Sequence, residues 1–135
     1  MGRSILAIVI GFLVIGAASF GTDALVRSRM PEMFDAAGAV TNTGMLLFTM
    51  FYVGVFAVAG CYLAAVIAGR APMKHALILG ALGLVFNIAG TVAMWNTAPA
   101  WYHVVSLLLV MPFAWLGGRI REGQVGQRTP LAARA

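Results

Sequence analysis

Hydrophobic residues run through this chain in long blocks that charged side chains rarely interrupt. Three stretches, 4–22, 36–69 and 75–118, contain no Asp, Glu, Lys or Arg. A helix needs about 20 predominantly apolar residues to cross a lipid bilayer. Each stretch is therefore long enough for one crossing, and the third is long enough for two.

Turn-forming residues divide the apolar blocks into helices. Pro99 has no amide hydrogen and disfavours helical geometry at Ala98, so the third block breaks within 96–100. Gly69 and Pro72 form a typical helix stop and restart. The pattern predicts an all-α, four-helix membrane bundle with spans over residues 4–25, 44–68, 74–95 and 100–118.

Small residues share one face of each predicted span when positions are placed 100° apart. In the third span this stripe is Ala76, Gly80, Gly83, Asn87, Gly90 and Thr91. The corresponding stripes are Ala7, Gly11, Ala18 and Gly21 in the first span, Gly54, Ala57, Cys61, Ala64, Ala65 and Ala68 in the second, and His103, Ser106, Val110, Ala114 and Gly117 in the fourth. Tyr52 is among the bulky residues on the opposite side of the second span. Because small residues let helices approach closely in lipid, we expect these faces to pack together.

Composition and charge support a membrane protein and indicate its orientation. The chain is 61% hydrophobic and 10% charged, whereas soluble domains contain roughly 25% charged residues. If both termini are cytoplasmic, that side holds seven of the nine basic residues, Arg3, Arg70, Lys74, Arg119, Arg121, Arg128 and Arg134, and the outer side holds Arg27 and Arg29. This positive-inside bias predicts cytoplasmic termini. The basic residues form no cluster with interleaved aromatics, so we do not expect nucleic-acid binding.

The two ends of the chain and the first loop carry further expectations. An alternative interpretation of the first span is a signal peptide, but its hydrophobicity continues to Leu25. The tail 119–135 is basic, polar and interrupted by Gly and Pro, so we expect it to be disordered. In the outer loop 26–42, Pro31 and Glu32 are typical of a helix start and predict a short interfacial helix.

Few polar residues fall inside the predicted spans, and these are the candidates for a binding site. Asn87 lies near mid-membrane, where it needs a hydrogen-bond partner such as Ser106 or a backbone carbonyl. Thr91 and His103 lie between Asn87 and the outer surface. His103 is a candidate ligand residue, or a residue that pairs with Asp23 at the outer end of the first span.

Aromatic residues cluster at the turn between the last two spans. The segment 95-WNTAPAWYHVV-105 places Trp95, Trp101 and Tyr102 at the expected headgroup level, which is typical of an interfacial aromatic belt. Asn96, Thr97 and Pro99 are turn residues. The segment is therefore predicted to be an interfacial turn.

The sequence shows no arrangement typical of catalysis or of a metal site. His75 and His103 lie at opposite membrane surfaces, and no Cys, His and carboxylate cluster supplies the ligands that zinc needs. No serine occupies a glycine-framed nucleophile elbow. We therefore expect neither an enzyme nor a resident metal or cofactor.

The segments 60-GCYLAAVIAGRAPMKHALILG-80 and 101-WYHVVSLLLVMPFAWLGGRIR-121 resemble those of a group of short bacterial four-span membrane proteins. The resemblance implies a bacterial inner membrane and implies no activity. Two better-known four-span groups fit poorly. Small multidrug exporters need a carboxylate buried in the first span, and this span has no acid before Asp23. Dual-topology fluoride channels, like some of those exporters, need a weak charge bias, whereas the basic residues here divide seven against two.

The favoured function is a non-catalytic membrane protein that acts through helix association, as a homo-oligomer or as an accessory subunit of a membrane complex. One alternative is a small transporter or channel with a polar path through Asn87, Thr91, Ser106 and His103. Another is a binder of an apolar cofactor such as quinone, haem or pigment, with His103 as ligand.

Overall fold

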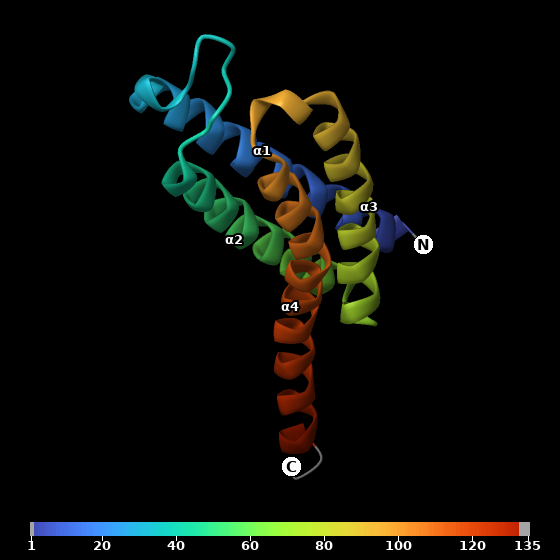
Figure 1. Ribbon diagram of the computed structural model, residues 1–135. Coiled ribbons are helices and arrows are strands. Elements are labelled where there is room, and N and C mark those ends of the chain that lie inside the picture. Colours follow the sequence, from blue (N-terminus) through green and yellow to red (C-terminus); the bar gives the residue numbers. More distant parts are fainter. Residues whose placement is uncertain (1, 133–135) are drawn as a thin grey trace.

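The computed structural model describes residues 2–132, with side chains described as far as residue 126 (Figure 1). Over this range the chain forms α1 (Gly2–Arg29), η1 (Pro31–Met33), α2 (Thr43–Ala68), α3 (Pro72–Ala93), η2 (Trp95–Thr97) and α4 (Ala100–Ala132). The four α-helices are each long and apolar enough to cross a membrane. The prediction of an all-helical chain with four apolar helices is confirmed.

Local chemistry explains where the helices begin and end. The side chain of Asn42 caps α2 by accepting a hydrogen bond from the Met45 amide at 3.0 Å. Gly69 ends α2 in the left-handed conformation, at φ 75°. Pro72 then opens α3 at a position where a missing amide hydrogen costs nothing. α2 and α3 therefore form a tight hairpin.

The helices are arranged as two inclined pairs. α1 lies beside α2, α3 lies beside α4, and α2 also packs against α4 (Figure 1). One end of the bundle, here called the loop end, carries the segment 30–42 and η2. The other, the tail end, carries the turn 69–71 and the emerging C-terminal part of α4, and Arg3 Nε donates there to the Ile67 carbonyl at 2.8 Å.

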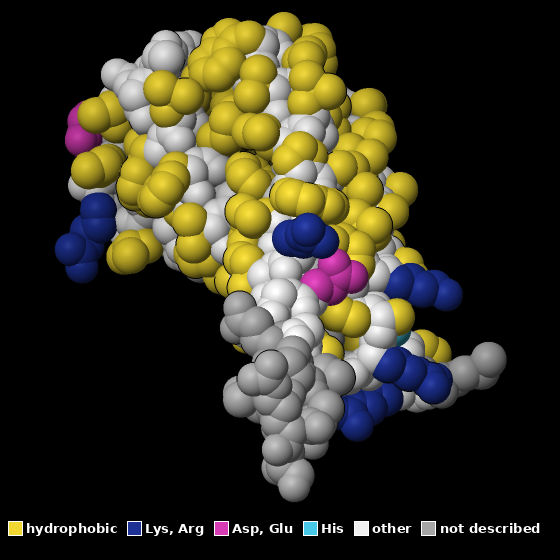
Figure 2. Space-filling model, turned by 90° about the horizontal axis from the view of Figure 1, so that it is seen from below, with side chains coloured by type: hydrophobic (Ala, Val, Ile, Leu, Met, Phe, Trp, Pro, Cys, Tyr) yellow, Lys and Arg dark blue, Asp and Glu magenta, His cyan; other side chains and the backbone are white. Residues whose placement is uncertain are grey.

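Small residues form the core in the half of the bundle nearer the tail end. The most buried side chains there are Ala7, Cys61, Ala64, Ala65, Ala76, Leu79 and Ala114, each at most 2% exposed. Apart from Leu79, these positions come from the small-residue stripes of all four helices. Phe20, Phe51, Val92 and Leu108 are at least 69% exposed, as expected for a surface that contacts lipid. Figure 2 shows hydrophobic side chains over much of the flanks and several Lys and Arg side chains around the tail end.

Three features differ from the sequence-based expectations. Tyr52 was expected to face away from the bundle, but it is 7% exposed because its hydroxyl donates to Asp23 on α1. The short helix expected in the outer loop begins at Pro31, as the sequence indicates, but it is the three-residue 3-10 helix η1 alone.

The third difference concerns the tail. α4 continues beyond residue 118 to Ala132, so the expected loss of structure is not observed over 119–132. Arg, Glu and Gln favour helix, and local contacts add to this preference. Arg121 and the Tyr62 hydroxyl both donate to Gln124 Oε1. Residues 133–135 of the predicted tail lie outside the described range.

Candidate functional site

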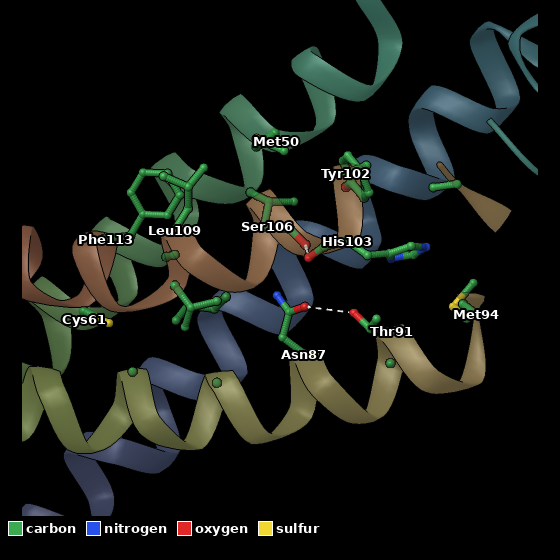
Figure 3. Close-up of a pocket in the computed structure, with 18 of the residues that line it drawn as sticks. Met50, Cys61, Asn87, Thr91, Met94, Tyr102, His103, Ser106, Leu109 and Phe113 are labelled. Carbon is green, nitrogen blue, oxygen red and sulfur yellow. Dashed lines mark hydrogen bonds between the residues drawn. The ribbon is translucent and has the colours of Figure 1, made fainter. Parts of the chain in front are cut away.

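The half of the bundle nearer the loop end contains a cavity of about 370 Å³ between α2, α3 and α4 (Figure 3). We call it the main cavity. Its walls are mainly apolar, with Met94, Thr97 and Tyr102 towards the loop end and Cys61 and Phe113 at the other end. Ile15 contributes the wall from α1. Tyr102 and Phe113 are eleven residues apart on α4, so the cavity extends about 16 Å along that helix.

The structure brings Asn87, Thr91, His103 and Ser106 together around this cavity. Asn87 and Thr91 come from α3 and are linked by a weak hydrogen bond of 3.5 Å from the Thr91 hydroxyl to Asn87 Oδ1. The Ser106 hydroxyl donates to the His103 carbonyl at 2.9 Å, within α4. Ser106, one of the partners considered for Asn87 from sequence, therefore bonds within α4, and Asn87 bonds within α3.

The amide group of Asn87 retains hydrogen-bonding capacity for a ligand. Its nitrogen points into the space between α3 and α4 (Figure 3), and no acceptor for it is found among the side chains described over 2–126. Because polar groups in hydrocarbon favour a partner, this amide favours a hydrogen-bond acceptor on a bound molecule.

His103 is fixed by its neighbours at the loop end. The residue is 6% exposed. Its ring stacks on Trp95, with centroids 5.2 Å apart and planes 16° apart, and Tyr102 approaches it edge-on at 5.9 Å. Nε2 lies 3.2 Å from the Trp95 carbonyl. Because a carbonyl oxygen only accepts, Nε2 carries the proton.

Asp23 lies outside the main cavity, in a neighbouring pocket of about 140 Å³ that we call the Asp23 pocket. The Tyr52 hydroxyl donates to its carboxylate, while His103 bonds to Trp95. Asp23 and His103, considered as a pair from sequence, therefore have different partners.

The predicted interfacial aromatics have two different environments. Trp95 is 50% exposed and Trp101 40% exposed, both at the loop end. Tyr102 is half-buried and lines both the main cavity and the Asp23 pocket. Its position makes it part of the candidate site.

Sequence reasoning missed the apolar wall that α2 contributes. Met50, Val53, Ala57 and Cys61 all line the main cavity. Their spacing of three, four and four residues places them on one helical face, which is the signal that could have identified this wall. Only the last two were assigned to the small-residue stripe.

The described part of the chain contains no group of three or more His, Cys, Asp and Glu side chains that could hold a metal ion. His75 lies at the tail end, where Nδ1 is 3.1 Å from the Ala71 carbonyl. No family model, no curated protein and no solved structure matches this chain.

Proposed function

We propose that this protein is a membrane-embedded, non-catalytic binder of a small, mainly apolar molecule, which occupies the main cavity. The observation that carries the proposal is a 370 Å³ cavity with a few convergent polar groups in apolar walls. Sites for small molecules have this composition and volumes of roughly 300–1,000 Å³.

The polar groups are suited to holding a molecule rather than to transforming it. Asn87 and Thr91 offer an amide and a hydroxyl, and Ser106 donates to the backbone rather than to the imidazole of His103. Nucleophilic catalysis needs a base within hydrogen-bonding reach of the nucleophile. Binding without turnover is therefore the expected behaviour.

Close packing near the tail end argues for a binding site over an open channel. An added Cβ at Gly80 would lie 2.4 Å from Ala114 Cβ, and one at Gly60 would lie 2.9 Å from the Gly11 carbonyl oxygen. The polar path through Asn87, Thr91, Ser106 and His103 thus extends only through the half nearer the loop end.

A cavity-filling substitution tests the proposal. Gly83 faces the main cavity, and a Cβ there would meet its nearest neighbour, Val110 Cγ1, at 3.9 Å. A leucine at 83 occupies the cavity without an initial backbone clash. We expect Gly83→Leu to abolish saturable binding of 1-decanol. Binding is measured in maltoside micelles by the change in tryptophan fluorescence. The matched control is Gly16→Leu, because a Cβ at Gly16 meets nothing within 4 Å. Equal decanol binding by both variants contradicts the proposal.

The orientation in the membrane is part of the same proposal. We place both termini on the cytoplasmic side of a bacterial inner membrane. The basic residues Arg3, Arg70 and Lys74 at the tail end, against Arg27 and Arg29 at the loop end, support this orientation. A C-terminal green fluorescent protein fusion should fluoresce, and a C-terminal periplasmic phosphatase fusion should be inactive. The reverse result rules out this orientation.

Helix association is the second candidate function. An apolar groove of about 530 Å³ lies between α2 and α4, lined by Phe51, Gly54, Val55, Val58, Ala59, Tyr62, Phe113, Leu116 and Ile120. The small residues in its lining, Gly54 and Ala59, are typical of surfaces where membrane helices associate. Recovery in mild detergent as a monomer with no co-purifying protein argues against this function.

A further inference from the structure

The Asp23 pocket adds a charged compartment to the loop end. It is lined by Asp23 and Arg27 from α1, Thr49 and Tyr52 from α2, and Tyr102 from α4. Its volume is about 140 Å³, so it is large enough for a small head group but not for a long chain.

Among the described residues, no oppositely charged group is bonded to the Asp23 carboxylate. Its hydrogen-bond partner is the neutral hydroxyl of Tyr52. Arg27 lines the same pocket but is held by two other residues of its wall: its guanidinium lies 4.6 Å from the centroid of Phe34, and Nη2 donates to the Gly38 carbonyl oxygen at 3.5 Å. The ion pair formed by described side chains, Arg119 with Glu122, lies at the tail end. A partly buried carboxylate with a neutral partner favours a cation.

Two tyrosine rings complement that charge. Tyr52 and Tyr102 come from different helices and both line the Asp23 pocket. A cation near a tyrosine face is attracted by the negative potential of the ring, and ammonium groups are bound in this way by aromatic pockets. A carboxylate with two phenol rings is therefore suited to an ammonium group.

The Asp23 pocket adjoins the main cavity. Thr97, Ala98 and Tyr102 line both spaces. A head group in the Asp23 pocket and an alkyl chain in the main cavity would therefore border the same three residues. Asn87 and Thr91, which line the cavity between the Tyr102 end and the Cys61 end (Figure 3), can bond a polar group part-way along that chain.

We propose that the ligand is a single-chain amphiphile with an ammonium head group, bound with the head in the Asp23 pocket and the alkyl chain towards Cys61 and Phe113. This inference rests on the proposed function of the main cavity and adds the chemical class of the ligand. The head lies at the loop end and the chain points to mid-membrane, the orientation of an amphiphile in one leaflet of a bilayer.

The test compares decyltrimethylammonium with 1-decanol, which has the same alkyl chain and no charge. Binding is measured by tryptophan fluorescence in maltoside micelles. The wild-type protein should bind the ammonium compound about tenfold more tightly than decanol, because charge attraction and cation–π contacts add to burial of the chain. Asp23→Asn keeps an acceptor for Tyr52, and it should lower the affinity for the ammonium compound to that for decanol, which removes the preference. Glu32→Gln removes an exposed negative charge at the same end and should leave the preference intact.

Each outcome separates the two proposals. Equal affinities in the wild type, or a preference that survives Asp23→Asn, overturns the ammonium head group while decanol binding still supports the main cavity. If Glu32→Gln also loses the preference for the ammonium compound, the preference comes from the general surface charge of the loop end. That result likewise overturns the inference. If neither compound binds saturably to a protein of native helix content, the proposed function itself is wrong.

Discussion

The two halves of the bundle use the same small residues in different ways. Near the tail end, an added Cβ on Gly117 would lie 2.6 Å from the Val58 carbonyl oxygen, and one on Gly60 would lie 2.2 Å from Ile15 Cγ1. Near the loop end, an added Cβ on Gly90 would meet nothing within 4 Å, and one on Gly83 would meet its nearest neighbour, Val110, at 3.9 Å. Glycine therefore allows close helix contact in the half nearer the tail end and leaves space between helices in the half nearer the loop end.

The difference arises from the inclination of the helix pairs, not from the sequence period. α1 and α2 are inclined to α3 and α4 (Figure 1), so a stripe that runs the length of a helix meets its neighbour over only part of that length. On α3, Ala76 is buried outside the main cavity, Gly80 is buried at the edge of the cavity lining, and Gly83 and Asn87 line the cavity and are partly exposed. A small-residue stripe in a membrane helix can therefore mark a packed interface and a binding cavity at once.

The largest expected effect is from a side chain placed in the tight half. Gly117→Val should lower the free energy of unfolding by about 3 kcal/mol or more, because the added atoms meet the backbone of α2, which cannot move aside. The measurement is loss of helical circular dichroism on titration with sodium dodecyl sulfate. Gly16→Val is the control and should be close to wild type. Equal losses in the two variants would remove the distinction between close-packed and open glycine positions.

A smaller effect is expected from the hydrogen bond between α1 and α2 near the loop end. Tyr52→Phe leaves the Asp23 carboxylate without its donor and should cost about 1–2 kcal/mol in the same titration. Asp23→Asn retains an acceptor for Tyr52 and should cost less. If Tyr52→Phe leaves the free energy of unfolding unchanged, the Tyr52–Asp23 contact does not stabilise the half of the bundle nearer the loop end.

The cap of α2 is expected to contribute about 1 kcal/mol. Asn42→Ala removes the acceptor for the Met45 amide and should destabilise the protein by that amount. Asn42→Ser retains a capping oxygen and should recover most of the loss. Failure of serine to restore stability would mean that Asn42 acts through something other than the cap.

The smallest effect is expected inside the main cavity. Gly83→Ala places a methyl group at ordinary contact distance, 3.9 Å from Val110, and alanine favours helix by about 1 kcal/mol over glycine. Stability should be unchanged or slightly higher. A loss as large as that of Gly117→Val would show that this half is also close-packed.

Helix number and the approximate helix ends follow from the sequence, because they depend on local quantities. The length of each apolar block limits the number of crossings, and Gly69, Pro72 and Pro99 mark where helices stop or restart. The continuation of α4 to Ala132 is not predicted from the sequence, because a polar tail interrupted by Gly and Pro is typical of disorder. The Arg, Glu and Gln residues of this segment nevertheless favour helix.

The candidate site was only partly accessible to sequence reasoning. Asn87, Thr91, His103 and Ser106 stood out as the polar residues of apolar spans, and the structure places them around one cavity. The burial of Tyr52 against Asp23 depends on how α1 and α2 approach each other, which no spacing within one helix encodes.

The central claim is that the half of the bundle nearer the loop end contains an accessible cavity, the main cavity. Thiol labelling in intact membranes tests this claim most directly. Ser106→Cys and Leu108→Cys are made in a Cys61→Ala background, which removes the single native cysteine. Residue 106 lines the main cavity, and residue 108, at similar depth, is 69% exposed on the outer surface. With a water-soluble methanethiosulfonate reagent, the cysteine at 106 should react at least about tenfold faster, because the polar groups of the cavity admit water and lipid does not. Equal rates at 106 and 108 would contradict the account.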